Sequence, residues 1–135
     1  MSRVPCVVLT ALIAAGCATT PTGAPQAISR SDIKAPHYAV PGPDKYPVTV
    51  TRDAGLLGAM CKIDIVIGPT TIARLSASER ITLHLPEGHA VIAAKTVGFC
   101  GGELRQVRAE VQPGRQIGFR VGFGANGDLF ITPAY

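Results

Sequence analysis

Two histidines and a glutamate surround a short turn, and they have the clearest capacity for chemistry in this chain. His84 precedes the sequence Pro86-Glu87-Gly88, and His89 directly follows it. Two imidazoles and a carboxylate are donors that zinc or copper can use. If the flanking strands form a hairpin, these side chains can meet across it. The pattern therefore permits a small-ligand or metal site at His84, Glu87 and His89.

The same residues also fit a polar turn without a ligand. Alternation of apolar and polar residues places His84 on the solvent side of its strand, and turns between strands collect polar residues. We favour this interpretation and expect neither a metal nor a cofactor. Pro86, Glu87, Gly88 and His89 then form a candidate contact surface for a protein partner.

Other catalytic signals are missing from the sequence. It contains no Gly-x-Ser-x-Gly, no His-Glu-x-x-His and no phosphate-binding loop, because the glycines at 98–102 are not followed by the required lysine and helix. The 13 basic and 9 acidic residues are spread singly along the chain, Arg52 and Arg120 among them, which is typical of a solvated surface. We expect no enzymatic activity and no nucleic-acid partner.

The N-terminal residues have the pattern of a secretory signal. Arg3 provides the positive charge, and residues 7–15 form an apolar run. This run is shorter than the roughly 20 residues that a membrane-spanning helix requires. We therefore expect residues 1–16 to be a cleaved signal peptide.

The sequence Ala15-Gly16-Cys17 resembles the lipobox of bacterial lipoproteins. The resemblance implies that Cys17 is acylated and that membrane lipid is one partner, because several acyl chains anchor a protein stably. Ala18, rather than an aspartate, implies sorting to the outer membrane, and we expect the periplasmic side. An ordinary signal peptide with a chance cysteine is the alternative. Because residues 18–43 are rich in Thr, Pro, Gly, Ala and Ser, we predict a flexible lipidated tether over 17–45.

Two cysteines remain outside the N-terminal segment, Cys61 and Cys100. In an oxidising compartment such a pair is more commonly bridged than free. The alternatives are two buried thiols, a redox pair or metal ligands, although no Cys-x-x-Cys motif is present. We predict a structural disulfide.

Residues 46–135 show the period-two alternation of β-strands, separated by Gly, Pro, Asn and Asp. In the expected strand after His89, Val91 and Ala93 are predicted to face inward. Seven or eight short strands with turns about every ten residues predict an all-β fold, a small antiparallel β-sandwich. The expected strands cover 46–52, 60–67, 71–75, 80–85, 89–97, 104–111, 116–123 and 129–132.

The stretch "ITLHLPEGHAVIAAK" resembles PEGA-type domains and related small lipoprotein domains. Leu85 to His89 and Val91 carry this resemblance, which is echoed at 111–115 and by the Arg-Asp-x-Gly pattern that starts at Arg52. It covers 47–132 and implies a noncatalytic surface module. A second stretch, 75–80, is similar to an element of peptidoglycan-binding domains but lacks the upstream Asn and the long helix.

These observations predict a membrane-anchored periplasmic lipoprotein that serves as a noncatalytic accessory or adaptor in the cell envelope. Its expected partners are membrane lipid and another envelope protein. The alternatives are a small-ligand or metal-binding lipoprotein that uses His84, Glu87 and His89, and a peptidoglycan-associated lipoprotein.

Overall fold

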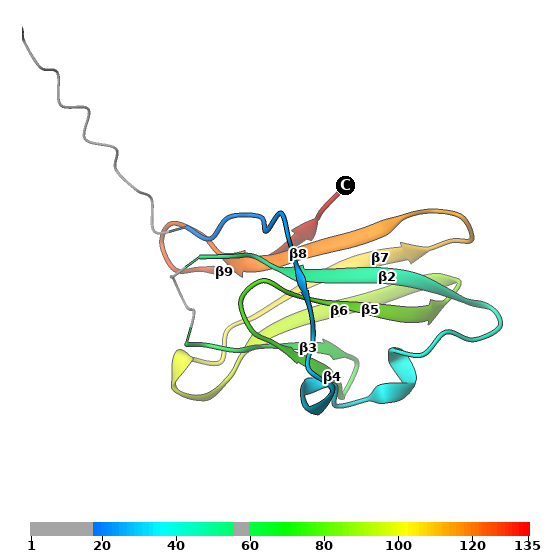
Figure 1. The fold of residues 1–135 in the computed structure, drawn as a ribbon, viewed down its shortest axis with the longest axis horizontal. Coiled ribbons are helices and arrows are strands. Elements are labelled where there is room, and N and C mark those ends of the chain that lie inside the picture. The colour runs from blue at the N-terminus through cyan, green and yellow to red at the C-terminus, as the bar shows by residue number, and fades with distance from the viewer. Residues whose placement is uncertain (1–17, 56–59) are drawn as a thin grey trace, which may run out of the picture.

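The computed structural model describes residues 18–55 and 60–135, and its regular structure is almost entirely β-sheet (Figure 1). Three short 3-10 helices accompany the strands: η1 (Arg30–Asp32), η2 (Pro36–Tyr38) and η3 (Gly98–Cys100). The strands are β1 (Gln26–Ala27), β2 (Lys45–Arg52), β3 (Ile63–Ile67), β4 (Thr70–Leu75), β5 (Glu79–Pro86), β6 (Gly88–Thr96), β7 (Leu104–Val111), β8 (Ile117–Phe123) and β9 (Leu129–Pro133).

These nine strands form two sheets, with the orders β1-β5-β2-β8-β9 and β4-β3-β6-β7. The predicted all-β sandwich is confirmed. Most neighbouring strands are antiparallel, but β2 runs parallel to β8 and β1 runs parallel to β5. This differs from the purely antiparallel arrangement that we expected. The connections β5–β6 and β7–β8 each pass from one sheet to the other, so strands distant in the sequence become neighbours.

The apolar core lies between the two sheets, and alternation predicted most of it. Four core residues of β2 and β3 are fully buried, namely Val48, Val50, Ile63 and Ile65. The inward residues of β5 and β8 are fully buried or nearly so. The exception is β6, where Val91 is 48% exposed while Ile92 and Ala94 are fully buried. Ala93 is buried as predicted, at 8% exposed, but Val91 is not, and the fully buried residues of this strand are Ile92 and Ala94. The run Ala90–Ala94 is apolar throughout and gives no alternation that could fix which side faces the core.

The segment before β2 lies against the sandwich rather than extending from it. Thr20 and Ala54 exchange backbone hydrogen bonds of 2.9 and 2.8 Å, and β1 pairs with β5. Ile33 forms a bridge with Ala73, and nearby Ala35 is buried. This differs from the flexible tether that composition predicted. Isolated apolar residues without helical or strand periodicity pack onto the core here, namely Ile28, Ile33 and Tyr38.

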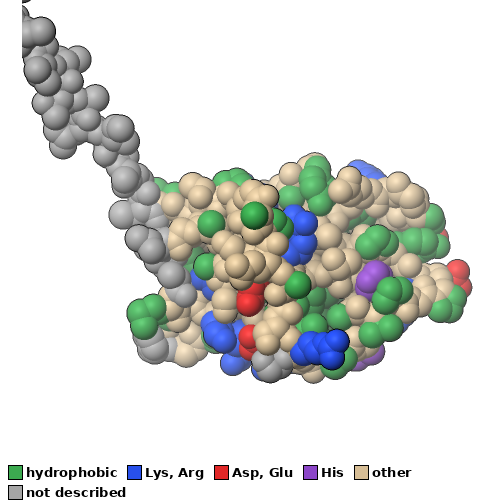
Figure 2. Space-filling model, in the orientation of Figure 1, with side chains coloured by type: hydrophobic (Ala, Val, Ile, Leu, Met, Phe, Trp, Pro, Cys, Tyr) green, Lys and Arg blue, Asp and Glu red, His purple; other side chains and the backbone are tan. Residues whose placement is uncertain are grey.

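Charged side chains on the face seen in Figure 2 are scattered among polar and apolar ones, and no single basic patch dominates. Within the described ranges, no helix is long and apolar enough to cross a bilayer.

Candidate functional site

The predicted contact turn lies at one end of the sandwich, which we call the distal end. The distal end contains the β5–β6 and β7–β8 connections and the start of β2 (Figure 1). Because β5 and β6 belong to different sheets, the turn at Pro86–Gly88 crosses between sheets and does not close a hairpin. His84 lies opposite Pro47, whereas His89 lies opposite Glu110. The two histidines therefore do not face each other across a hairpin, which was the arrangement that the metal-site alternative required.

The turn borders a shallow pocket of about 240 Å³ between β6 and β7. Glu87, Gly88 and His89 line one side, and Glu110 lines the other. His89 Nδ1 is 3.8 Å from Glu110 Oε1, and both side chains are more than half exposed. Among the residues that the structure describes, no group of three or more His, Cys, Asp or Glu side chains is placed to hold a metal ion.

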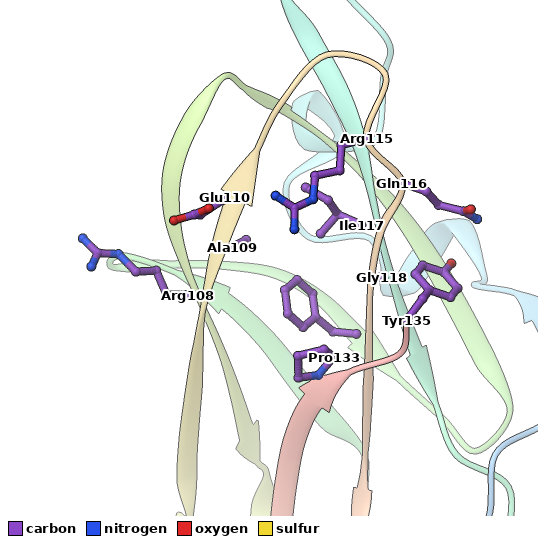
Figure 3. A pocket seen from close by; sticks show the side chains of 10 residues that line it. Arg108, Ala109, Glu110, Arg115, Gln116, Ile117, Gly118, Pro133 and Tyr135 are labelled. Atoms are coloured by element: carbon purple, nitrogen blue, oxygen red, sulfur yellow. The ribbon is translucent and has the colours of Figure 1, made fainter.

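A larger cleft of about 300 Å³ adjoins this pocket and shares Glu110 with it. We call it the distal cleft; it lies between β7 on one side and β8 with Pro133 on the other (Figure 3). Ile117, the nearly buried Phe119 and Pro133 form its apolar lining. The outer side of β7 carries Arg108 and Glu110, which point away from the cleft in Figure 3, whereas the side chain of Arg115 extends toward its opening.

The distal cleft lies on the side of the described sandwich where the edge strands of both sheets, β7 and β9, have no cover. On the opposite side, β1 covers the edge of β5, and the backbone N–H groups of Lys34 and Ala35 donate to Ile72 of β4 at 2.8 and 3.1 Å. Over 18–55 and 60–135, β7 pairs only with β6 and β9 only with β8. An uncovered edge strand is a template for another extended chain.

The direction of the backbone groups along β7 follows from its register. The Thr96 N–H donates to the Glu103 carbonyl at 3.2 Å, and the register continues from Lys95 opposite Leu104 to Gly88 opposite Val111. Because alternate residues of an antiparallel strand bond to the neighbouring strand, the backbone groups of the even-numbered residues 104 to 110 face the open edge. Near the start of the strand, the Glu103 carboxylate accepts the Leu129 N–H at 3.2 Å and links the two edges.

Comparison with protein-family models, with curated proteins and with solved structures gives no match for this chain. The resemblance to PEGA-type domains stays a prediction.

A second polar cluster lies at the opposite end of the sandwich, which we call the proximal end. The proximal end contains Thr19, the end of β2, η3 and the β8–β9 connection. Asp53 is only 1% exposed and accepts two hydrogen bonds from the Arg120 guanidinium, at 3.0 and 2.7 Å. The Thr19 hydroxyl is 3.2 Å from Asp53 Oδ2 and accepts the Phe123 N–H at 3.0 Å. The cluster thus attaches the N-terminal segment to two strands.

Arg52, expected on the surface, is instead 1% exposed at this end. Its Nη1 donates to the Leu75 carbonyl at 2.8 Å, and its guanidinium lies 5.8 Å from the centre of the Phe123 ring. Burial lowers the pKa of the Arg52 guanidinium, and the charge of nearby Glu79 acts in the opposite direction. The only sequence signal for this cluster is the Arg-Asp pair at 52–53, which carries part of the resemblance to PEGA-type domains.

Gly122 makes the close approach of Thr19 possible. A Cβ at this position would collide with the Thr19 hydroxyl and lie 3.1 Å from Asp53 Cβ. We expect Gly122→Ala to lower the free energy of unfolding by about 1–3 kcal/mol, as for other overpacked sites. Urea unfolding measures it, with Gly23→Ala as the control because a Cβ at Gly23 has no neighbour within 4 Å. Equal stability of the two variants would contradict the tight contact.

The predicted disulfide is confirmed: Cys61 and Cys100 are bonded, with Cα atoms 5.8 Å apart. It joins the segment before β3 to η3 at the proximal end. Cys17, the predicted lipidation site, lies outside the described residues.

Proposed function

We propose that this chain is an outer-membrane lipoprotein anchored through Cys17 on the periplasmic side. In this proposal it is a noncatalytic adaptor that binds an extended segment of another envelope protein along β7. The observation that carries the proposal is the open edge of β7 beside the distal cleft. The cysteine after two small residues supports the anchor, and the proposal requires no metal and no nucleic acid.

The open edge supplies the backbone part of the contact. β7 is eight residues long, and half of its backbone groups face away from β6. A partner segment that adds as a strand would gain main-chain hydrogen bonds, and pockets for alternate side chains would provide specificity.

The distal cleft supplies such a pocket. An apolar side chain of the partner would contact Ile117, Phe119 and Pro133, while Arg108 and Arg115 beside the cleft favour acidic neighbours in the same segment. The predicted contact turn lies next to this cleft through Glu110, so Glu87, Gly88 and His89 would contact the end of the bound segment. Anchoring both proteins at one membrane raises the effective concentration of a weak contact.

A proline on the open edge tests this proposal. The Gln106 side chain is exposed and its N–H faces the open edge, so Gln106→Pro removes a donor for an added strand without removing a bond to β6. A photo-crosslinking amino acid at position 108 reports the partner in cells. We expect one dominant crosslinked envelope protein, reduced at least about tenfold by Gln106→Pro, which corresponds to 1.4 kcal/mol.

The matched control is Gln106→Ala, which keeps the N–H and should keep the crosslink. Cys17→Ala provides the unanchored chain, in which the crosslink should weaken. Crosslinking that is unaffected by Gln106→Pro would show that β7 does not receive a strand. An intact mass without acyl chains on Cys17 would contradict the lipid anchor.

A further inference from the structure

We propose that the proximal end of the sandwich lies directly against the lipid surface, with the Met60 side chain in the headgroup region. This inference rests on the proposed acylation of Cys17. A protein on a long tether would move freely above the membrane, whereas here one end of the molecule faces the membrane.

Only a short length of chain separates the proposed anchor from the sandwich. Thr19 already belongs to the hydrogen-bonded structure and is two residues from Cys17. Because an extended chain advances at most about 3.6 Å per residue, the two Cα atoms are within about 7 Å of each other. Residues 20–45 follow this attachment and therefore do not lengthen the connection between the anchor and the sandwich.

The attachment fixes direction as well as position. The Thr19 N–H donates to the Phe123 carbonyl at the end of β8, at 3.0 Å. Thr20 pairs with Ala54, just after β2, in both directions. Bonds to the ends of two neighbouring strands, together with the contact between Thr19 and Asp53, limit rotation of the sandwich about the anchor.

The same end of the sandwich carries exposed apolar side chains. Met60 is 88% exposed, and Leu104 at the start of β7 is 49% exposed. Met60 directly precedes Cys61, which the disulfide holds against η3. Removing such a side chain from water is favourable, so contact with lipid would stabilise this orientation. The ammonium group of Lys62, on a half-exposed side chain nearby, lies 3.8 Å from the Asp32 carboxylate and could also contact the phosphates of lipid headgroups.

This placement orients the proposed binding site. β7 begins at Leu104 at the proximal end and ends at Val111 beside the distal cleft. Eight residues of strand span about 25 Å, so the cleft would open well away from the lipid surface, where another envelope protein can reach it.

Tryptophan fluorescence tests the orientation, because the natural chain contains no tryptophan. Met60→Trp introduces one reporter at the proximal end, and Gln112→Trp introduces one at an exposed position of the distal end. The acylated variants are incorporated into phosphatidylethanolamine–phosphatidylglycerol vesicles with and without brominated acyl chains. We expect Met60→Trp emission to shift to shorter wavelength and to be quenched at least twofold by brominated lipid. Gln112→Trp emission should not change.

Each result has a distinct meaning. Met60→Trp in a Cys17→Ala chain should not be quenched if the anchor places the reporter. Acylated Met60→Trp protein without quenching would overturn the orientation while leaving strand binding at β7 intact. Equal quenching of both reporters would also overturn it, because the sandwich would then have no preferred end at the membrane. A chain that carries no acyl group would overturn both the orientation and the proposed anchor.

Discussion

Replacing Asp53 with alanine is expected to lower the free energy of unfolding by up to about 3–5 kcal/mol, the cost of removing one partner of a fully buried ion pair, which is reduced here because the Arg120 side chain is 30% exposed. The Asp53 carboxylate is 1% exposed and accepts both Arg120 hydrogen bonds. Its removal leaves the partly buried Arg120 guanidinium without its acceptor and takes one partner from the Thr19 hydroxyl. The same change should detach the N-terminal segment from the proximal end.

Two measurements check this expectation. Urea unfolding gives the loss of stability, and limited proteolysis followed by mass spectrometry reports cleavage near residues 19–22. Asp64→Ala is the matched control, because Asp64 also holds an arginine through two hydrogen bonds, from Arg74 at 2.7 and 3.1 Å, but this partner belongs to β4 and not to the segment that begins at Thr19. Both variants lose an ion pair, but only Asp53→Ala should expose that segment. Equal proteolysis of the two variants would contradict the proposed attachment.

Local patterns were sufficient to predict β2 to β9 of this fold, but not β1, which lies in the predicted tether. Alternation from Arg80 to Leu85 and the turn signal at Asn126-Gly127 predicted β5 and the β8–β9 connection. The pairing of Cys61 with Cys100 followed from their number and the expected compartment. These features depend on neighbouring residues or on a count, and both can be obtained from the sequence.

The arrangement of the strands could not be predicted, because it depends on contacts between distant residues. Nothing near Pro86 indicates that β5 and β6 enter different sheets, so the supposed hairpin with His84 and His89 was a reasonable but wrong local inference. The parallel pairing of Val48 with Ile117 is equally nonlocal.

The candidate site also depends on contacts between distant residues, which local sequence patterns do not predict. The edge of β7 is the open one because the N-terminal segment covers the opposite side of the sandwich and leaves β7 and β9 uncovered. Composition alone suggests a tether there, since the few apolar residues that hold the segment have no periodicity. Arg52 was likewise assigned to the surface, because its burial depends on Leu75 and Phe123, which are remote in the sequence.

Removing the disulfide is expected to have an effect of similar size. In the chain-entropy model, a bond across a sequence separation of 39 contributes about 4 kcal/mol by restricting the unfolded chain. We therefore expect the Cys61→Ser, Cys100→Ser double variant to unfold at a clearly lower urea concentration. Reduction of the natural protein should add the mass of two hydrogen atoms and produce the same shift.

The two treatments control each other, because the reductant opens the bond without changing the sequence and the double variant should not respond to the reductant. In the folded protein, the loss of local stability should also differ between the two ends of the sandwich. Because the bond joins the start of β3 to η3, hydrogen exchange should increase first at the proximal end, around Ile63 and Thr96, and least near Val111 and Ile117. The distal cleft should then still bind its partner under conditions where the reduced protein remains folded. Loss of binding before global unfolding would instead show that the two ends of the sandwich are coupled.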